Sequence, residues 1–357
     1  MKPEKFFFLS VLLTLFIFIS PASLNLVIDP YFIYHKPYFI KPPYFVHADR
    51  YQSAGMINSF LADPQEGYNK LIIGTSLSQN FTPDKNTMPL TLAGGRAKEL
   101  AAITQKALAT GSVKSVIWEI FISYNDHNPN DIHPKSPLPL YLYNHVLWDD
   151  WRYVFNQSVL SESIRLLKKG NKGRKSLDTL YKWGEKEAEM FREFQSPEKM
   201  AQTRLQIQGS SLPFSLQPPA DIVNTTFPSV DQNLISILKA YPDIHFDLFF
   251  PPVSYFEYIK SGNAGFWREM LMRRYVLEQT KELKNIDVYQ FDLIDGIGDN
   301  LSIYRDSQHY PAWVNDKIMA SIKTGEHKIN LEQWHSDVQA LAKRINVFAA
   351  EFKKPLY

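Results

Sequence analysis

Short apolar runs alternate with helical patterns along most of the chain, from about residue 69 onward. Each run has the length of a buried strand, and between the runs apolar residues recur at three and four positions, the period of an amphipathic helix. Strands that alternate with helices imply right-handed crossovers and a mainly parallel sheet covered on both faces. The pattern predicts an α/β fold, a flavodoxin-like three-layer α/β/α sandwich with a five-stranded parallel sheet. The predicted strands are KLIIG (70–74), PLTLA (89–93), SVIWEIFI (115–122), IHFDLFF (244–250) and IDVYQFD (286–292), and the predicted helices are 96–110, 230–240 and 264–284.

The interval between the third and fourth runs is too long for a simple crossover. Residues 126–228 begin as a polar loop, NDHNPNDIHPKSP, and continue through stretches with a helical pattern. We interpret them as a helical insertion beside the sheet that serves as a lid or docking surface. The sheet-bearing domain then covers residues 69–325, and residues 326–357 have the period of a C-terminal helix.

The N-terminal segment has no charged residue between positions 6 and 28. A helix of that length can just cross a bilayer of roughly 30 Å. A cleaved signal peptide is the alternative, because the most apolar part, residues 6–20, has the length of a signal-peptide core and is followed by small residues. We favour an uncleaved anchor over residues 1–28, since no clear A-x-A site follows. Lys2 and Lys5 favour a cytoplasmic N-terminus, which predicts a single-pass inner-membrane protein with a periplasmic or extracellular domain.

The segment that follows, residues 29–68, is rich in tyrosine and proline. Pro-Tyr-Phe occurs three times, at 30–32, 37–39 and 43–45. Proline blocks helix formation, and tyrosine suits an interface where its ring is buried and its hydroxyl is wet. We expect a stalk packed along the globular domain.

Composition removes several classes of function. Lysine and arginine are scattered among acids at a net charge of +2, which is unlike the basic stripe of a nucleic-acid binder. The chain has no cysteine, which excludes disulfides, thiolate metal sites and cysteine nucleophiles. Asp126, His127, Asp131 and His133 resemble a metal cluster, but Asn, Asp and Pro in a loop more often form turns through their own backbone. We expect neither a metal nor another cofactor.

The candidate chemistry begins where the first run ends. Ligands of an open parallel sheet bind beyond the carboxyl ends of the strands, where the strand order reverses, and the first strand borders that point. Ser76 would lie there, with Gly74 permitting the sharp exit from the strand. A serine nucleophile needs a base and a group that orients the base. Asp306 and His309 lie three apart, a spacing that brings a carboxylate to Nδ1 and leaves Nε2 for a hydroxyl. Ser78 is a rival hydroxyl.

Four short motifs follow the order and the strand-end placement of the SGNH (GDSL-type) hydrolase superfamily, which the chain resembles. The resemblance covers roughly residues 69–325 without the insertion. The family usually has aspartate where Thr75 stands, a change familiar among its envelope-glycan acetyltransferase relatives, and glycine where Ser123 stands. The motifs are Gly74-Thr75-Ser76, Ala93-Gly94-Gly95, Ser123-Tyr124-Asn125-Asp126 and Asp306-Ser307-Gln308-His309.

The resemblance implies a role for each matching residue. Ser76 would attack an acyl carbonyl, His309 would act as base and later as acid, and Asp306 would orient His309. Asn125→Ala would then slow turnover strongly without unfolding the protein. The implied oxyanion hole consists of the backbone N–H of Ser76, a backbone N–H at Gly94 or Gly95, and the side-chain amide of Asn125.

A second resemblance concerns location and substrate. The segment FFPPVSYFEY (249–258), and an anchor followed by DPY (29–31) and DRY (49–51), resemble membrane-anchored SGNH-like proteins encoded with bacterial surface polysaccharides. In those proteins the loop at 249–258 borders the active-site crevice, and a rigid surface turn is the alternative.

The expected function is that of a membrane-anchored serine O-acyltransferase or carbohydrate esterase. Its substrate or acceptor would be an envelope or exported glycan, with acetyl as the favoured acyl group, and a membrane-bound acyl-donor protein is a further expected partner. The alternative is a non-catalytic SGNH-like scaffold that binds glycan or organises a polysaccharide-synthesis complex through the insertion.

Overall fold

Five strands form one parallel sheet in the order β2-β1-β3-β4-β5. The computed structural model describes residues 5, 7–8, 10, 21–36, 45–46, 50–125, 127–144, 146–177, 180, 183, 193–210 and 213–353. The strand order reverses between β1 and β3, the switch point of a doubly wound sheet. The predicted α/β fold with a five-stranded parallel sheet is confirmed. The strands are β1 (Lys70–Gly74), β2 (Thr87–Thr91), β3 (Ser115–Glu119), β4 (His245–Phe250) and β5 (Ile286–Gln290).

The register brings the carboxyl ends of the central strands to one edge of the sheet. Gly74 of β1 pairs with Thr91 of β2, and Ile73 pairs with Trp118 of β3. β3 ends at Glu119, before the end of the predicted run, because the chain turns into the short 3-10 helix η4 (Ile122–Asn125). The loops that leave β1, β2 and β3 therefore share one edge.

Helices surround the sheet and pack into the core that it forms. α10 is divided by Gly262, whose φ of +69° lies outside the helical range, and it contacts the C-terminal helix α12. α12 lies inside the segment 326–357. The helices are α2 (Gln52–Met56), α3 (Ala97–Leu108), α4 (Trp151–Val154), α5 (Gln157–Lys169), α7 (Pro197–Gln208), α8 (Pro228–Val230), α9 (Ser236–Ala240), α10 (Tyr255–Thr280), α11 (Ala312–Thr324) and α12 (Leu331–Lys353).

The beginning of the tyrosine-rich segment packs into the molecule. Phe32 is fully buried in the main core. The carboxylate of Asp29 accepts hydrogen bonds from the backbone N–H of Ile33 at 3.0 Å and of Tyr34 at 2.6 Å, and from the Tyr153 hydroxyl at 2.7 Å. Residues 29–36 are therefore bound to the insertion as well as to the core.

Most of the predicted anchor lies outside the described residues. Residues 21–28 are helical, and the Asn25 amide donates to the Val154 carbonyl at 2.8 Å while Ser163 Oγ donates to Asn25 Oδ1 at 2.9 Å. Within the part of the chain that the structure describes, no helix is both long enough and apolar enough to span a bilayer. The anchor over residues 1–28 stays a prediction.

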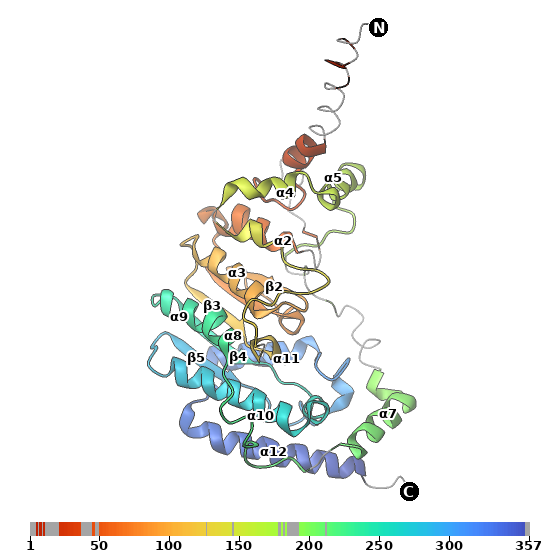
Figure 1. Cartoon of the computed structure of the whole chain (residues 1–357), viewed down its shortest axis with the longest axis vertical. Coiled ribbons are helices and arrows are strands. Elements are labelled where there is room, and N and C mark those ends of the chain that lie inside the picture. The colour runs from red at the N-terminus through yellow and green to blue at the C-terminus, as the bar shows by residue number, and fades with distance from the viewer. Residues whose placement is uncertain are drawn as a thin grey trace.

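The insertion extends along the molecule (Figure 1). Its helices α4 and α5 lie at one end, beside the helix of residues 21–28, and α7 packs against α12 at the other end. Trp183, which the insertion also supplies, contacts the Ser76 carbonyl at the carboxyl edge of the sheet.

Candidate active site

Ser76 lies on a tight turn at the carboxyl end of β1. The strand stops at Gly74, and residues Ser76–Ser78 form the 3-10 helix η3, whose first turn is capped by Thr75 Oγ1 accepting the N–H of Leu77 at 3.4 Å. A Cβ at Gly74 would lie 2.6 Å from a carboxylate oxygen of Glu119. Only glycine fits at this exit from the strand, as the sequence predicts.

Ser76, His309 and Asp306 form a hydrogen-bonded relay, although 233 positions separate Ser76 from His309. Ser76 Oγ lies 2.8 Å from His309 Nε2, and His309 Nδ1 lies 2.7 Å from Asp306 Oδ2. With Asp306 ionised, Nδ1 carries the proton and Nε2 accepts the Ser76 hydroxyl. A nucleophile, a base and an orienting carboxylate in this geometry are the parts that acyl transfer requires.

Asp306 is held in its ionised form. Burial acts to raise the pKa of this carboxyl, but hydrogen bonding and charge attraction from His309 outweigh it and hold the pKa well below its usual range. The other oxygen, Oδ1, accepts the backbone N–H of Gln308 at 2.8 Å and of His309 at 2.9 Å. The same carboxylate therefore shapes the turn and orients the imidazole.

The loop after β4 supports this turn. Ser254 Oγ donates to the Ser307 carbonyl at 2.7 Å, and the Gln308 amide donates to Glu257 Oε1 at 2.8 Å. Ser254 also caps α10 by accepting the N–H of Glu257 at 3.3 Å. The segment 249–258 thus ends in the first turn of a helix that contacts the turn of residues 306–309.

Glu119, at the end of β3, binds the turn that carries Ser76. Its side chain is fully buried and accepts the Thr75 N–H at 3.1 Å, the Thr75 hydroxyl at 2.5 Å and the Ser78 hydroxyl at 2.5 Å. Burial raises the pKa of Glu119, while these hydrogen bonds act to lower it. Sequence reasoning missed Glu119, and the one available signal was an acid at the end of an apolar strand.

The contact with Glu119 distinguishes the two candidate nucleophilic hydroxyls, those of Ser76 and Ser78. Ser78 Oγ is buried against Glu119, whereas Ser76 Oγ faces His309. Of the two serines, Ser76 alone has an imidazole within hydrogen-bond reach in the described structure.

A cavity of about 420 Å³ opens beside Ser76. Gly94 has a φ of +62°, which favours glycine, and a Cβ there would come within 3.1 Å of the His133 ring. His133 is held in turn by the Ser136 N–H, which donates to Nδ1 at 3.0 Å. Residues that line the cavity include Ser76, Gly94, Gly95, Ser123, His133 and Lys135.

Asn125 lies in a different setting from the other predicted site residues. Its amide donates to Glu269 Oε2 at 2.6 Å, and Arg268 donates to its backbone oxygen at 2.7 Å. It lines a neighbouring cavity of about 160 Å³. Ser123, two residues earlier, lines the Ser76 cavity, is only 4% exposed, and has no hydrogen-bond partner for its hydroxyl among the described residues. The oxyanion-hole role of Asn125 stays a prediction.

Trp183 of the insertion contacts both Ser76 and His309. Its indole N–H donates to the Ser76 carbonyl at 3.0 Å, and its ring lies edge-on to the His309 ring at 5.5 Å between centroids. Arg305 stacks on the indole at 5.7 Å. A single aromatic residue in a helical insertion gave no sequence signal, so this contact was missed.

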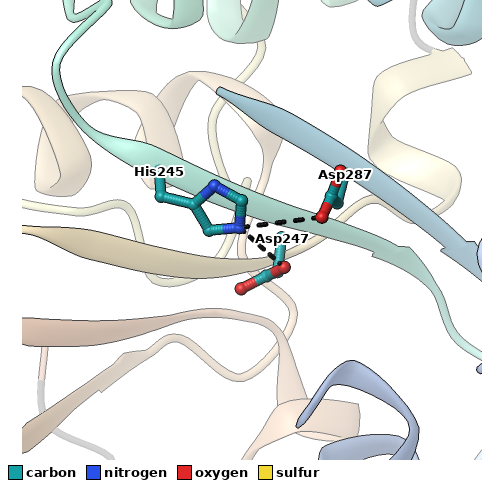
Figure 2. Close-up of side chains that lie close together, drawn as sticks. All are labelled: His245, Asp247 and Asp287. Atoms are coloured by element: carbon teal, nitrogen blue, oxygen red, sulfur yellow. Dashed lines mark hydrogen bonds and ion pairs between the residues drawn. The ribbon is translucent and has the colours of Figure 1, made fainter. Parts of the chain in front are cut away.

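A separate polar cluster lies at the opposite edge of the sheet (Figure 2). His245 Nε2 is 3.2 Å from Asp247 and 3.9 Å from Asp287, and their ligand atoms lie within 4.8 Å of one another. Lys328 already pairs with Asp287, and the imidazole is half exposed. We interpret the cluster as an ion-pair network across β4 and β5. Of the metal cluster considered from the sequence, Asp126 lies outside the described residues.

No family model matches the chain, and no curated protein is significantly similar to it. The site therefore has to be interpreted from its own geometry.

Proposed function

We propose that the chain is an SGNH-like serine acyltransferase or esterase that forms an acyl-enzyme on Ser76. The observation that carries the proposal is the relay from Ser76 Oγ to His309 Nε2 at 2.8 Å and from His309 Nδ1 to Asp306 at 2.7 Å. The position of Ser76 beside the reversal of strand order supports it. The motifs that resemble the SGNH superfamily support it as well.

The proposed reaction has two steps that share one proton carrier. Ser76 Oγ attacks the acyl carbonyl carbon and gives its proton to His309 Nε2, which passes it to the departing alcohol oxygen as the ester C–O bond breaks. An acceptor hydroxyl then attacks the acyl-Ser76 ester and gives its proton to His309. The bond to Ser76 Oγ breaks, and His309 returns the proton to the serine.

Negative charge on the carbonyl oxygen needs hydrogen-bond donors in the same cavity. The backbone N–H groups of Ser76 and Gly94 are the proposed donors, since the N–H of Gly95, the alternative, already donates to the Leu92 carbonyl at 2.8 Å. Ser123 lines this cavity, and its hydroxyl, which has no hydrogen-bond partner among the described residues, is a further candidate donor, whereas the Asn125 amide already donates to Glu269. We propose that Ser123 supplies the side-chain donor that the family resemblance would assign to Asn125.

The proposed substrate is an O-acyl group, acetyl above all, of an envelope or exported glycan. The support is the uncharged N-terminal run, which favours export and attachment to the inner membrane with the domain outside the cytoplasm. If the acceptor is a sugar hydroxyl, the protein is a transferase, and a membrane-bound acyl-donor protein is its proposed partner. If the acceptor is water, it is an esterase.

Release of p-nitrophenolate from p-nitrophenyl acetate tests the acyl-enzyme. The full-length chain in detergent should release it, and Ser76→Ala or His309→Ala should lower the rate at least about 10⁴-fold. Ser78→Ala is the matched control, because the Ser78 hydroxyl contacts Glu119 instead of His309. An unchanged rate in Ser76→Ala would rule the proposal out.

Acyl analysis of the envelope glycan separates the two acceptors. Loss of O-acetyl groups in cells that lack the protein supports transfer, and a gain supports the esterase. Unchanged acetylation, together with an inert Ser76, favours the non-catalytic scaffold.

A further inference from the structure

Large apolar side chains are exposed in three segments at one end of the molecule. The segments are the helix of residues 21–28, the stretch from 146 to 155 that contains α4, and α5 (Figure 1). They contact one another, since Asn25 donates to the backbone oxygens of Val154 and Asn156, and Ile28 packs against Leu166. We call the exposed side chains of these segments the apolar end. It comprises their exposed large apolar residues, which are Leu26, Val27, Val146, Trp148, Trp151, Phe155, Ile164 and Leu167.

Two tryptophans dominate the apolar end. Trp148 is 90% exposed and Trp151 is 58% exposed, and the Trp151 ring lies 6.3 Å from that of Phe155. Elsewhere in the molecule, Trp118 and Trp267 are fully buried. Single exposed apolar residues are normal in soluble proteins, but several in adjoining segments mark an interaction surface.

Helix α5 is apolar on two sides. Val159 and Leu166 are buried in the molecule, while Ile164 and Leu167 point outward. A surface helix of a soluble domain needs only one apolar stripe, facing the core. The outward stripe therefore needs a second apolar environment.

Basic residues follow the outward stripe. Lys168, Lys169 and Lys172 are exposed, and within the described part of the chain they form no ion pair. The nearby Glu162 is already engaged by Arg165 at 2.6 Å and by Arg174 at 2.8 Å. Exposed tryptophans beside unpaired lysines fit the headgroup region of a bilayer, where indole rings sit at the interface and ammonium groups meet lipid phosphates.

We propose that the apolar end lies in the headgroup region of a phospholipid bilayer and sets the orientation of the catalytic domain. The inference rests on the proposed anchorage, because the uncharged run of residues 6–28 ends in the helix that forms part of this surface. Continuity of the chain brings α4 and α5 to the membrane surface. The domain then lies against the bilayer in one orientation instead of swinging on a tether.

The absence of cysteine allows a direct test. The variant Trp148→Cys has a single cysteine, which is labelled with the environment-sensitive fluorophore NBD. The labelled full chain is then reconstituted in phosphatidylethanolamine–phosphatidylglycerol vesicles. Val347→Cys in α12 is the matched control, since Val347 is an apolar residue with 63% exposure at the other end of the molecule. We expect blue-shifted emission at 148, with several-fold stronger quenching by headgroup-proximal spin-labelled lipids than at 347. Phe155→Cys should repeat the result at 148.

Each other outcome overturns the inference and identifies what failed. If quenching is equally weak at positions 148 and 347 in a chain that floats with the vesicles, the apolar end does not contact the bilayer, although the N-terminal anchor does. If the chain does not float with the vesicles, the result contradicts the proposed anchor as well. If the label at position 148 is protected from water in native membranes but exposed to water in pure lipid vesicles, the apolar end binds a protein partner instead of lipid. p-Nitrophenyl acetate turnover is measured on the same variants, so a failure of the proposed catalysis is recognised separately.

Discussion

Two carboxylates at the candidate site have opposite electrostatic settings. Asp306 is partly open to solvent and bound to His309, which holds its pKa low, whereas Glu119 is fully buried and its pKa is raised by that burial. Asp306 therefore stays ionised at neutral pH and can support a cationic imidazole. Glu119 contacts the Ser76 turn through Thr75 and Ser78, so it would position the proposed nucleophile through its neighbours.

Replacing Glu119 by glutamine should change how stability depends on pH. A carboxyl whose folded-state pKa is raised stabilises the fold fully below its unfolded pKa of about 4.3, and loses that contribution as pH rises through the folded pKa. Glutamine does not titrate, so the Tm of Glu119→Gln relative to wild type should rise from about pH 5 to pH 8. Thermal unfolding at several pH values measures this, and a constant or falling difference would contradict the raised pKa.

Ser123 and Asn125 can be distinguished by a pair of alanine variants. Removing one oxyanion donor costs about 2.7–4 kcal/mol of transition-state stabilisation, or about 10²–10³ in kcat. We expect that loss for Ser123→Ala with an unchanged or higher Tm, because its buried hydroxyl has no partner in the described structure. Asn125→Ala should lower kcat less and should lower the Tm, since it removes the hydrogen bond to Glu269 Oε2 and leaves Glu269 only its contact with Arg273. A larger fall in kcat for Asn125→Ala than for Ser123→Ala would instead support Asn125 as the oxyanion donor.

The residues that the sequence indicated are those whose partner is local or whose type is restrictive. Asp306 and His309 are three apart, and Gly74 stands where a Cβ has no room. Glu119 and Trp183 act through contacts 44 and 107 positions away in the chain, on the backbone and side chains around Ser76. No local pattern encodes such pairings, so they could only be found in the folded structure.

At the scale of elements, the site is built from strand ends. The end of β1 leads into the turn that carries Ser76, the loop after β2 supplies Gly94 and Gly95, β3 supplies Glu119, and the turn before α11 supplies His309. These elements meet because parallel strands end at the same edge. The insertion then adds Trp183 over the imidazole.

Trp183→Phe tests whether the insertion contributes to the site. Phenylalanine keeps a ring beside His309 but removes the hydrogen bond to the Ser76 carbonyl, a bond worth about 0.5–1.5 kcal/mol. We expect a several-fold fall in kcat with little change in Tm, measured with p-nitrophenyl acetate. Trp313→Phe, an exposed tryptophan in α11, is the control and should leave kcat unchanged.

Element boundaries were predicted best where the sequence pattern and the pairing agree. β1 occupies the predicted residues 70–74, while β2 lies two residues earlier than predicted because Lys70 pairs with Thr87. Pro89 fits within β2 because this strand lies at the edge of the sheet. α10 begins well before residue 264, since Ser254 caps it and Gly262 interrupts it without ending it.

At the scale of the whole molecule, the N-terminal helix, the insertion and the sheet domain form a continuous structure. The helix of residues 21–28 contacts α5, and α7 of the same insertion contacts α12 (Figure 1). Trp183, also of the insertion, donates a hydrogen bond to the Ser76 carbonyl. A surface that holds α4 and α5 at a bilayer would therefore fix the direction in which the Ser76 cavity opens. That arrangement would suit the proposed enzyme, whose glycan substrate and acyl donor would both be at the membrane.

The most direct test of the central claim is covalent labelling of Ser76 by a fluorophosphonate. The full-length folded chain is treated with the reagent, digested, and the modified peptide is identified by mass spectrometry. We predict one adduct, on Ser76, which is lost in Ser76→Ala, strongly slowed in His309→Ala and retained in Ser78→Ala. Absence of labelling in folded wild-type protein, or labelling that persists in Ser76→Ala, would contradict the account.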